Sequence, residues 1–311
     1  GMGMAFVSIA DEPYALFYNP AGLANSPYTQ VGATAGRMLS PVGKLAFSAL
    51  AYTRPFDLVK SATIGGAYLA QRQIDSGDKD IVLFHYSQEF KVPELFLTKP
   101  LKVGGNFKVI NAEQGAGAGF GFGFDVGVLA RSVMGLSGGF TLSDLSSNVG
   151  LPRPMIGMGV SYLWRRWLTI AGDFRIRSNL TEFYPGVEAS FFQGLLKVRG
   201  GRALKLDYVE SVSVGVGVNF SPVILDIAMS LPWSGVQRNS GGYQFAFTYK
   251  FGAPPFAGAG VGDVAGAQGG GPRLSGSTTT TSRLGCSTTP TQAVRDTATG
   301  ARTNIAYVIF A

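Results

Sequence analysis

Apolar and polar side chains alternate at period two through most of residues 29–252, which predicts β-strands with one apolar face. The clearest stretch is 243–251, where an aromatic residue occupies every second position. Residues 118–131, 167–177 and 208–220 repeat the pattern, with glycine, serine and charged residues between the apolar positions. We predict about fourteen strands, near residues 29–38, 43–54, 60–73, 79–91, 101–112, 118–131, 134–143, 154–164, 166–177, 181–192, 195–202, 208–220, 222–231 and 240–251.

The length of these strands favours a membrane barrel. Most have about ten to thirteen residues, which exceeds the usual globular strand and suits a tilted strand that crosses a bilayer. The connections alternate between short and longer ones, as in outer-membrane barrels. The exception is 92–100, which is long where a short turn is expected. The short turns are Ser132–Val133, Arg165, Gln193–Gly194 and Ser221, and the longer loops are 144–153, 203–207 and 232–239.

The composition then indicates which face of the strands contacts lipid and which face lines the lumen. Only 14% of the residues are charged, and 44 of 311 are glycine, whereas a soluble β-protein of this size needs an outer face rich in lysine and carboxylates. The apolar face is therefore predicted to contact lipid, and the glycine-rich face to line a narrow, filled lumen. No apolar run is long enough for a membrane helix. The predicted fold class is all-β, a transmembrane antiparallel β-barrel, with aromatic girdle residues Tyr162, Trp164, Trp167, Phe220, Trp233, Tyr249 and Phe251.

Residues 1–28 have a different pattern from the barrel region. Asp11 is predicted to cap a short helix that has Pro13 in its first turn. Asn19-Pro20 is predicted to stop that helix, and the small residues that follow permit close packing. The segment is apolar, so we expect a short helical plug, or hatch, inside the lumen. The alternative is that Asn19-Pro20 is a helix stop with no functional role.

These N-terminal residues also carry a resemblance to a known family. The chain opens with Gly1-Met2-Gly3, continues to an Asn-Pro-Ala-Gly-Leu-Ala block and then enters the alternating strands. This order resembles the FadL/PorV superfamily of outer-membrane barrels, and PorV/PorQ-like members in particular. The resemblance implies a 14-stranded barrel with an N-terminal hatch, and it implies hatch residues Asn19, Pro20, Ala21, Gly22 and Leu23.

The resemblance leaves two functions open. FadL-type members pass small hydrophobic molecules passively, whereas PorV-type members serve protein secretion by the type IX system. We therefore expect a hatch-gated transporter, or else a secretion-associated or structural barrel with protein partners. Both imply a bacterial, Gram-negative-type outer membrane with outer-membrane lipids as partners. No signal-peptide pattern is present at the start of the sequence.

Other classes of function find little support. The net charge is +7, but the basic residues are scattered, so no nucleic-acid partner is predicted. With one histidine and one cysteine, Cys286, the chain offers neither a histidine-rich metal site nor an internal disulfide. The glycine run 115–121 continues into a strand, which is not the context of a nucleotide loop. We predict no cofactor, no metal and no enzymatic activity.

The polar residues of the lumen face are the remaining candidates. We expect them to form hydrogen bonds or ion pairs between the barrel wall and the plug. Residues 253–311 are a glycine- and threonine-rich tail that we expect to be flexible. The predicted domains are thus 1–28, 29–252 and 253–311. The candidate lumen residues are His85, Glu89, Asp125, Asp173, Arg175 and Arg177.

Overall fold

A computed structural model describes the N-terminal segment and the strands of this chain. It leaves out 41–42, 74–76, 92–99, 115–116, 132–133, 146–153, 166, 178–179, 206–207, 233–240 and 254–311. The predicted tail, with Cys286, the girdle residue Trp233 and the long connection after residue 91 therefore lie outside the described residues.

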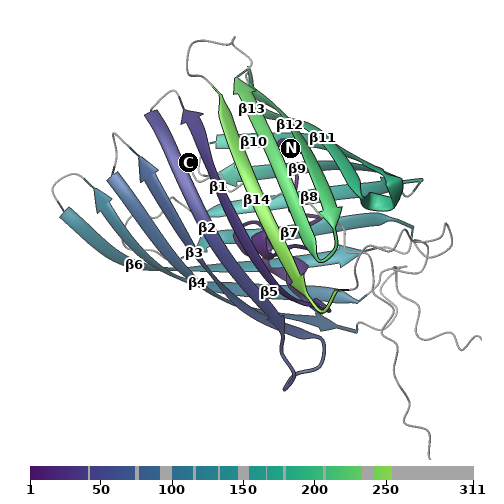
Figure 1. Ribbon diagram of the computed structural model, residues 1–311. Coiled ribbons are helices and arrows are strands. Elements are labelled where there is room, and N and C mark those ends of the chain that lie inside the picture. Colours follow the sequence, from purple (N-terminus) through teal and green to yellow (C-terminus); the bar gives the residue numbers. More distant parts are fainter. Residues whose placement is uncertain are drawn as a thin grey trace, which may run out of the picture.

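The strands form one closed antiparallel barrel in which each strand pairs with its sequence neighbours and β1 pairs with β14 (Figure 1). Closure joins Thr29 to Phe251 and continues to Arg37 opposite Tyr243. The strands are β1 Thr29–Ser40, β2 Gly43–Pro55, β3 Ala62–Gln73, β4 Gly77–Phe90, β5 Leu101–Gln114, β6 Gly117–Arg131, β7 Leu136–Leu145, β8 Met155–Trp164, β9 Leu168–Arg177, β10 Leu180–Phe191, β11 Leu196–Lys205, β12 Tyr208–Phe220, β13 Val223–Pro232 and β14 Gly242–Phe251. The predicted 14-stranded barrel is confirmed.

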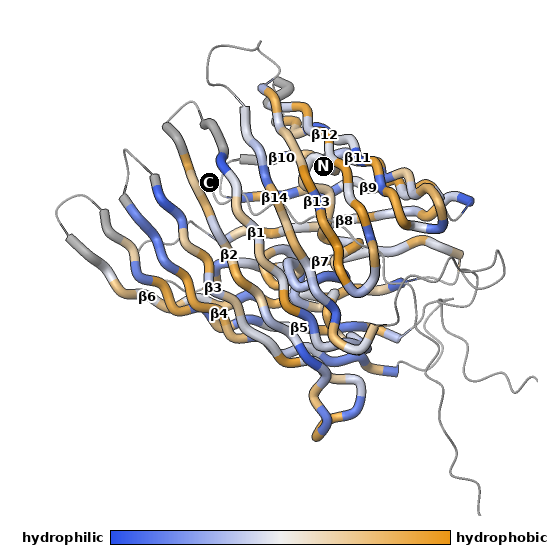
Figure 2. Tube along the Cα trace, viewed as in Figure 1, coloured by the Kyte–Doolittle hydropathy of each residue, from blue (hydrophilic) through white to orange (hydrophobic). Residues whose placement is uncertain are grey.

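The outer face of this barrel is apolar. The alternating aromatic residues of β14 other than the half-buried Tyr249 are exposed, as are those of β6. Figure 2 shows hydrophobic residues along the middle of strands such as β4 and β13, with more hydrophilic residues toward strand ends. In a closed barrel every ladder is paired within the sheet, so an apolar outer face can be stable in lipid. No helix in the described ranges is long and apolar enough to span a membrane.

Residues 1–24, hereafter the N-terminal segment, lie within the ring of strands (Figure 1). Nearly all of them are buried. The segment contains two short 3₁₀ helices, η1 Pro13–Phe17 and η2 Pro20–Leu23, and a third, η3 Phe192–Gly194, forms the turn between β10 and β11. Each helix of the segment begins at a proline, whose fixed φ and missing N–H suit the first helical position.

One local prediction in this segment is wrong. Glu12, and not Asp11, occupies the N-cap of η1, and no side chain caps that helix. The helix is also a single 3₁₀ turn, which leaves few free N–H groups for a cap to satisfy. Asn19 follows the end of η1, as predicted, but it also begins η2.

Candidate functional site

The lumen around the N-terminal segment is the candidate site, because buried polar residues and buried apolar residues meet there. The apolar part is a single cluster to which segment residues such as Phe6, Tyr14 and Leu16 contribute. The wall supplies inward-facing apolar side chains to the same cluster, among them Leu69, Leu83 and Ile110. Burial of each such side chain contributes about 1.5–3 kcal/mol of stability. This burial therefore stabilises the segment in its position in the lumen.

Asn19 links the segment to itself and to the wall. Its Oδ1 accepts a hydrogen bond from the Ala21 N–H at 3.1 Å, which caps η2. Its Nδ2 donates to the Val7 carbonyl at 2.8 Å and to the Val128 carbonyl of β6 at 3.2 Å. The side chain thus joins the two halves of the segment and fixes both to the barrel.

The residues after Asn19 are buried and closely packed. Pro20, Ala21, Gly22 and Leu23 form η2, which packs against β5 and β6. A Cβ at Gly22 would lie 2.0 Å from the Ala10 carbonyl oxygen, so only glycine fits there. Residues 19–23, the block predicted as part of the hatch, are therefore closely packed against their surroundings.

Several glycines of the barrel wall lie directly against the N-terminal segment. A Cβ at Gly104 of β5 would lie 2.5 Å from the Pro20 carbonyl carbon, and one at Gly127 of β6 would lie 2.1 Å from Asn19 Oδ1. Gly139 of β7 is similarly close to the Val7 carbonyl oxygen, at 2.4 Å. The lumen glycines are thus contact points that any side chain would obstruct.

Asp173 and Arg175 of β9 bind the backbone of the first residues of the segment. Asp173 Oδ2 accepts hydrogen bonds from the Phe6 N–H at 2.6 Å and the Val7 N–H at 2.8 Å. Arg175 Nη2 donates to the Met4 carbonyl at 2.9 Å, and its guanidinium lies over the rings of Tyr18 and Tyr184, 5.2 and 4.8 Å from their centroids. A carboxylate that accepts two backbone hydrogen bonds makes a strong, directional anchor.

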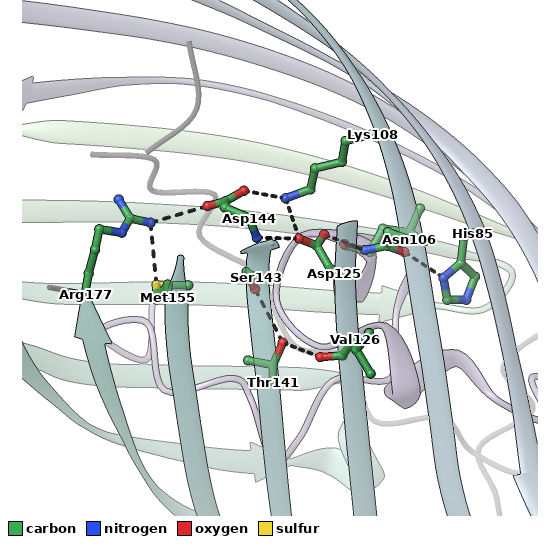
Figure 3. A network of polar contacts seen from close by, with 11 residues as sticks. His85, Asn106, Lys108, Asp125, Val126, Thr141, Ser143, Asp144, Met155 and Arg177 are labelled. Atoms are coloured by element: carbon green, nitrogen blue, oxygen red, sulfur yellow. Dashed lines mark hydrogen bonds and ion pairs between the residues drawn. The ribbon is translucent and has the colours of Figure 1, made fainter. Parts of the chain in front are cut away.

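His85 of β4, Asn106 of β5 and Asp125 of β6 form a chain of hydrogen bonds from strand to strand (Figure 3). Asn106 Nδ2 donates to the Leu16 carbonyl of the segment at 2.7 Å and to Asp125 Oδ2 at 3.0 Å. The Asn106 Oδ1 therefore accepts from His85 Nδ1 at 2.9 Å, which leaves His85 Nε2 to accept from the Ser87 hydroxyl. A neutral His85 satisfies both contacts, so it acts here as a structural hydrogen-bonding group.

The same chain continues into buried ion pairs. Lys108 Nζ lies 2.8 Å from both Asp125 Oδ1 and Asp144 Oδ1, and Arg177 lies 3.6 Å from the other oxygen of Asp144 (Figure 3). Glu89, at the far end of β4, is half-buried and accepts a hydrogen bond from Asn25. The structure thus links His85, Asp125 and Arg177 and places Glu89 apart from them.

A second buried ion-pair cluster lies on β10, β11 and β13. Arg199 pairs with Glu188 at 2.8 Å and with Asp226 at 2.6 Å, and Lys197 also pairs with Glu188. These pairs join strand to strand, like those around Lys108, whereas we expected them to join the wall to the plug. Asp173 and Arg175 instead bind backbone N–H and C=O groups, which carry partial charges of their own. The contacts of Asp173 and Arg175 with the plug are therefore hydrogen bonds and not ion pairs.

The cavity beside the segment is small. It lies next to Gly3 and Met4, is bordered by Phe47 and Ala203, and has a volume of about 30 Å³. A water molecule needs about 10–15 Å³ by this measure, whereas a cavity that binds benzene measures about 150 Å³. A hydrophobic ring therefore does not fit there with the segment in this position.

Sequence reasoning missed the apolar side chains of the lumen face, which we expected to be mostly small or polar. Leu69, Leu83 and Ile110 are at most 1% exposed. The signal was present in Ile81-Val82-Leu83-Phe84, an uninterrupted apolar run that is typical of a strand buried on both faces. Within the described residues no group of His, Cys, Asp and Glu side chains could hold a metal ion.

Comparison with solved structures supports the fold. The barrel is similar to the CymD monoaromatic hydrocarbon channel, with a TM-score of 0.56 and 12% identity over 81% of this chain and 98% of that chain. It is also similar to a deltaS2 mutant of the TodX monoaromatic hydrocarbon channel, with a TM-score of 0.57 and 12% identity over 80% and 96%.

The barrel fold of this chain is thus the type of fold that these two channels have. This likeness agrees with the barrel fold that the resemblance in the sequence implies. Both of these neighbours are described as channels. No family model and no curated protein matches the chain.

Proposed function

We propose that this protein is an outer-membrane channel for passive transport of small hydrophobic molecules, gated by the N-terminal segment acting as a hatch. The observation that carries the proposal is the shared fold with two monoaromatic hydrocarbon channels over nearly their whole length. The apolar outer face supports a place in a bacterial outer membrane, surrounded by its lipids. In this proposal residues 1–28 are the hatch and 29–252 the barrel.

The packing of the lumen defines the mechanism. Because the cavity beside Met4 is too small for a ring, a hydrophobic molecule passes only when the segment moves. The contacts to be broken are hydrogen bonds such as the one that Asp173 accepts from the Phe6 N–H and the one that Asn19 donates to the Val128 carbonyl. The apolar surface of the segment that becomes exposed is then covered by the passing molecule. Asn19, Pro20, Ala21, Gly22 and Leu23 shape the closed position and take no part in chemistry.

A second function is favoured by the same packed lumen. A barrel that stays closed suits a structural role or a PorV-like role in protein secretion, with envelope or secretion proteins as partners. The two functions differ in one respect that can be tested. Transport requires the segment to move, and a partner-binding barrel does not.

A disulfide lock tests this requirement. A Cβ at Gly157 would lie 3.6 Å from Val7 Cγ2 and 2.6 Å from the Thr141 methyl group. We would therefore combine Val7→Cys and Gly157→Cys with Thr141→Ser, which removes that methyl group, in a Cys286→Ser background. The resulting pair approaches the geometry of a disulfide.

The measurement is uptake of radiolabelled toluene by Gram-negative cells that produce the barrel, before and after reduction. We expect the oxidised lock to abolish barrel-dependent uptake and a reductant to restore it, while each single-cysteine variant transports throughout. Equal uptake by the oxidised and reduced lock would contradict the hatch. Absence of barrel-dependent uptake even for the unmodified chain would contradict transport and favour the partner-binding barrel.

A further inference from the structure

The ladder between β1 and β14, hereafter the seam, closes the barrel (Figure 1). The other ladders of the described strands join neighbours in the sequence. At the seam, by contrast, Thr34 of β1 binds the carbonyl of Phe245 on β14, which is 211 residues away in the chain. Bringing distant parts of a chain together costs more conformational entropy than forming a hairpin. The seam is therefore the ladder whose formation costs the most entropy.

Tyr14 of the N-terminal segment lies on the lumen side of the seam. Its hydroxyl oxygen is 2.8 Å from the Ala33 carbonyl oxygen and 2.6 Å from the Phe247 carbonyl oxygen. Ala33 and Phe247 are register partners, one on each strand. A tyrosine has a single O–H, which the two carbonyls share, so the hydroxyl bridges both strands. Asn19, by comparison, binds the carbonyl of one strand, β6.

The wall leaves room for the ring of Tyr14 at this position. A Cβ at Gly32 of β1 would lie 3.0 Å from Tyr14 Cζ and 3.2 Å from Pro13 Cβ. A larger residue there would push the ring away from the carbonyls. Tyr14 is itself fully buried. Packing therefore holds the hydroxyl on the seam together with its hydrogen bonds.

A second set of side-chain hydrogen bonds crosses the seam close by. Thr34 Oγ1 donates to the Phe245 carbonyl at 2.9 Å and accepts from Gln244 Nε2 at 2.9 Å. All of these groups belong to the wall, so this set needs no residue of the segment. The Tyr14 bridge, in contrast, exists only when the segment is docked. The seam thus has one side-chain connection of its own and one that the segment supplies.

We propose that Tyr14 is a clasp that couples docking of the segment to closure of the barrel. The bridging hydroxyl stabilises the docked segment and the closed ladder together, so by linkage a loss in one weakens the other. The segment therefore helps to hold the wall closed as well as filling the lumen. Because the clasp concerns the wall, it stands independently of the proposed transport.

Hydrogen exchange of the full chain in neutral detergent tests the clasp. Tyr14→Phe keeps the ring and removes the hydroxyl, so seam amides around Ala33 and Phe247 should exchange about fivefold faster, the scale of one hydrogen bond. The amides of Phe6 and Val7, which bind β9, should keep their protection. Their protection would show that the first residues of the segment are still docked.

The reverse experiment starts from the wall. Thr34→Val removes the seam's own connection and leaves the segment unchanged, and it should accelerate exchange of the Ala15 and Tyr18 amides, which form the hydrogen bonds of η1. The matched control is Thr141→Val, because Thr141 is another buried threonine that donates to a carbonyl of the neighbouring strand, here between β7 and β6. This control should leave exchange in η1 unchanged.

A second control separates the hydroxyl of Tyr14 from general packing. Tyr18→Phe changes another buried tyrosine of the segment, whose ring lies against Phe6 and Arg175, and it should leave seam exchange unchanged. Equal seam exchange in Tyr14→Phe and the unmodified chain would overturn the clasp. An equal rise in Tyr14→Phe and Tyr18→Phe would assign the effect to packing of the segment. Unchanged exchange of η1 in Thr34→Val would contradict the coupling.

Discussion

The two halves of the N-terminal segment are held in the lumen in partly different ways. In residues 1–10, charged side chains of the wall bind the backbone of the segment, as Asp173 binds the N–H groups of Phe6 and Val7. In residues 13–24, two wall side chains, Lys102 and Asn106, also bind segment carbonyls, but side chains of the segment bind the backbone of the wall as well. Tyr14 donates its hydroxyl toward the carbonyls of Ala33 and Phe247, and Asn19 donates to that of Val128.

This difference determines which residues of the sequence carry the contacts that hold each half of the segment in place. The second half carries much of its docking information in its own residues, together with wall residues such as Gly104 and Asn106. The first half depends on β9, whose residues are far away in the chain. If the two halves are held independently, a change in one anchor should release one half and leave the other protected.

The largest effect is expected at Gly104. Gly104→Ala places a Cβ 2.5 Å from the Pro20 backbone, which cannot move without breaking the fit of η2. Overpacking of this kind costs about 1–3 kcal/mol, and we expect the upper end. Hydrogen exchange of residues 13–24 should accelerate about a hundredfold. The control is Gly138→Ala on β7, where an added Cβ meets nothing within 4 Å. Equal exchange in the two variants would show that the glycine contact does not hold the second half.

The sequence predicted the second half better than the first for this reason. The Asn19-Pro20-Ala21-Gly22-Leu23 block signals a tight, packed turn by local chemistry alone, and the structure places it in such a turn. Strand alternation likewise predicted the barrel and its outer face, because the period of two directly gives the side-chain direction. Local patterns sufficed for these features.

Contacts between distant strands could not be predicted in this way. Alternation puts Asp173 and Arg175 on the lumen face, but their contact with Phe6 or Met4 depends on barrel register and on the path of the segment. The same holds for Lys108, which reaches Asp125 on one neighbouring strand and Asp144 beyond it. The Asp11 cap was wrong because capping rules for α-helices say little about a single 3₁₀ turn.

The second-largest effect is expected at Asp173, which binds the first half of the segment. Asp173→Ala leaves the Phe6 and Val7 N–H groups buried without their acceptor, which costs about 1–3 kcal/mol. Exchange at these two amides should accelerate, while residues 13–24 keep their protection. Asp173→Asn retains an oxygen acceptor and should have a smaller effect. Acceleration throughout the segment would show that its halves are released together, and the comparison would then fail.

The smallest effect is expected at Glu12, which joins the two halves. Its carboxylate is fully buried and its oxygens accept no hydrogen bond from the described residues. Burial raises the pKa of Glu12 well above its usual range, and the nearby carboxylates of Asp226 and Asp11 add to this, while Lys250 and Arg199 oppose it. The docked state therefore favours the neutral acid.

Glu12 should accordingly make docking depend on pH. A carboxyl group whose pKa is higher in the folded state contributes stability that is complete below its unfolded pKa and is lost as the pH rises through the folded pKa. Exchange protection factors of the segment, corrected for the intrinsic pH dependence of exchange, should fall from acidic to alkaline pH. Glu12→Gln should remove that fall, whereas Asp11→Asn, which alters the half-buried neighbour, should keep most of it.

A fall that persists in Glu12→Gln would assign the titration to another group of the cluster, such as Lys250. If only one half of the segment responds in the unmodified chain, the two halves move separately around Glu12.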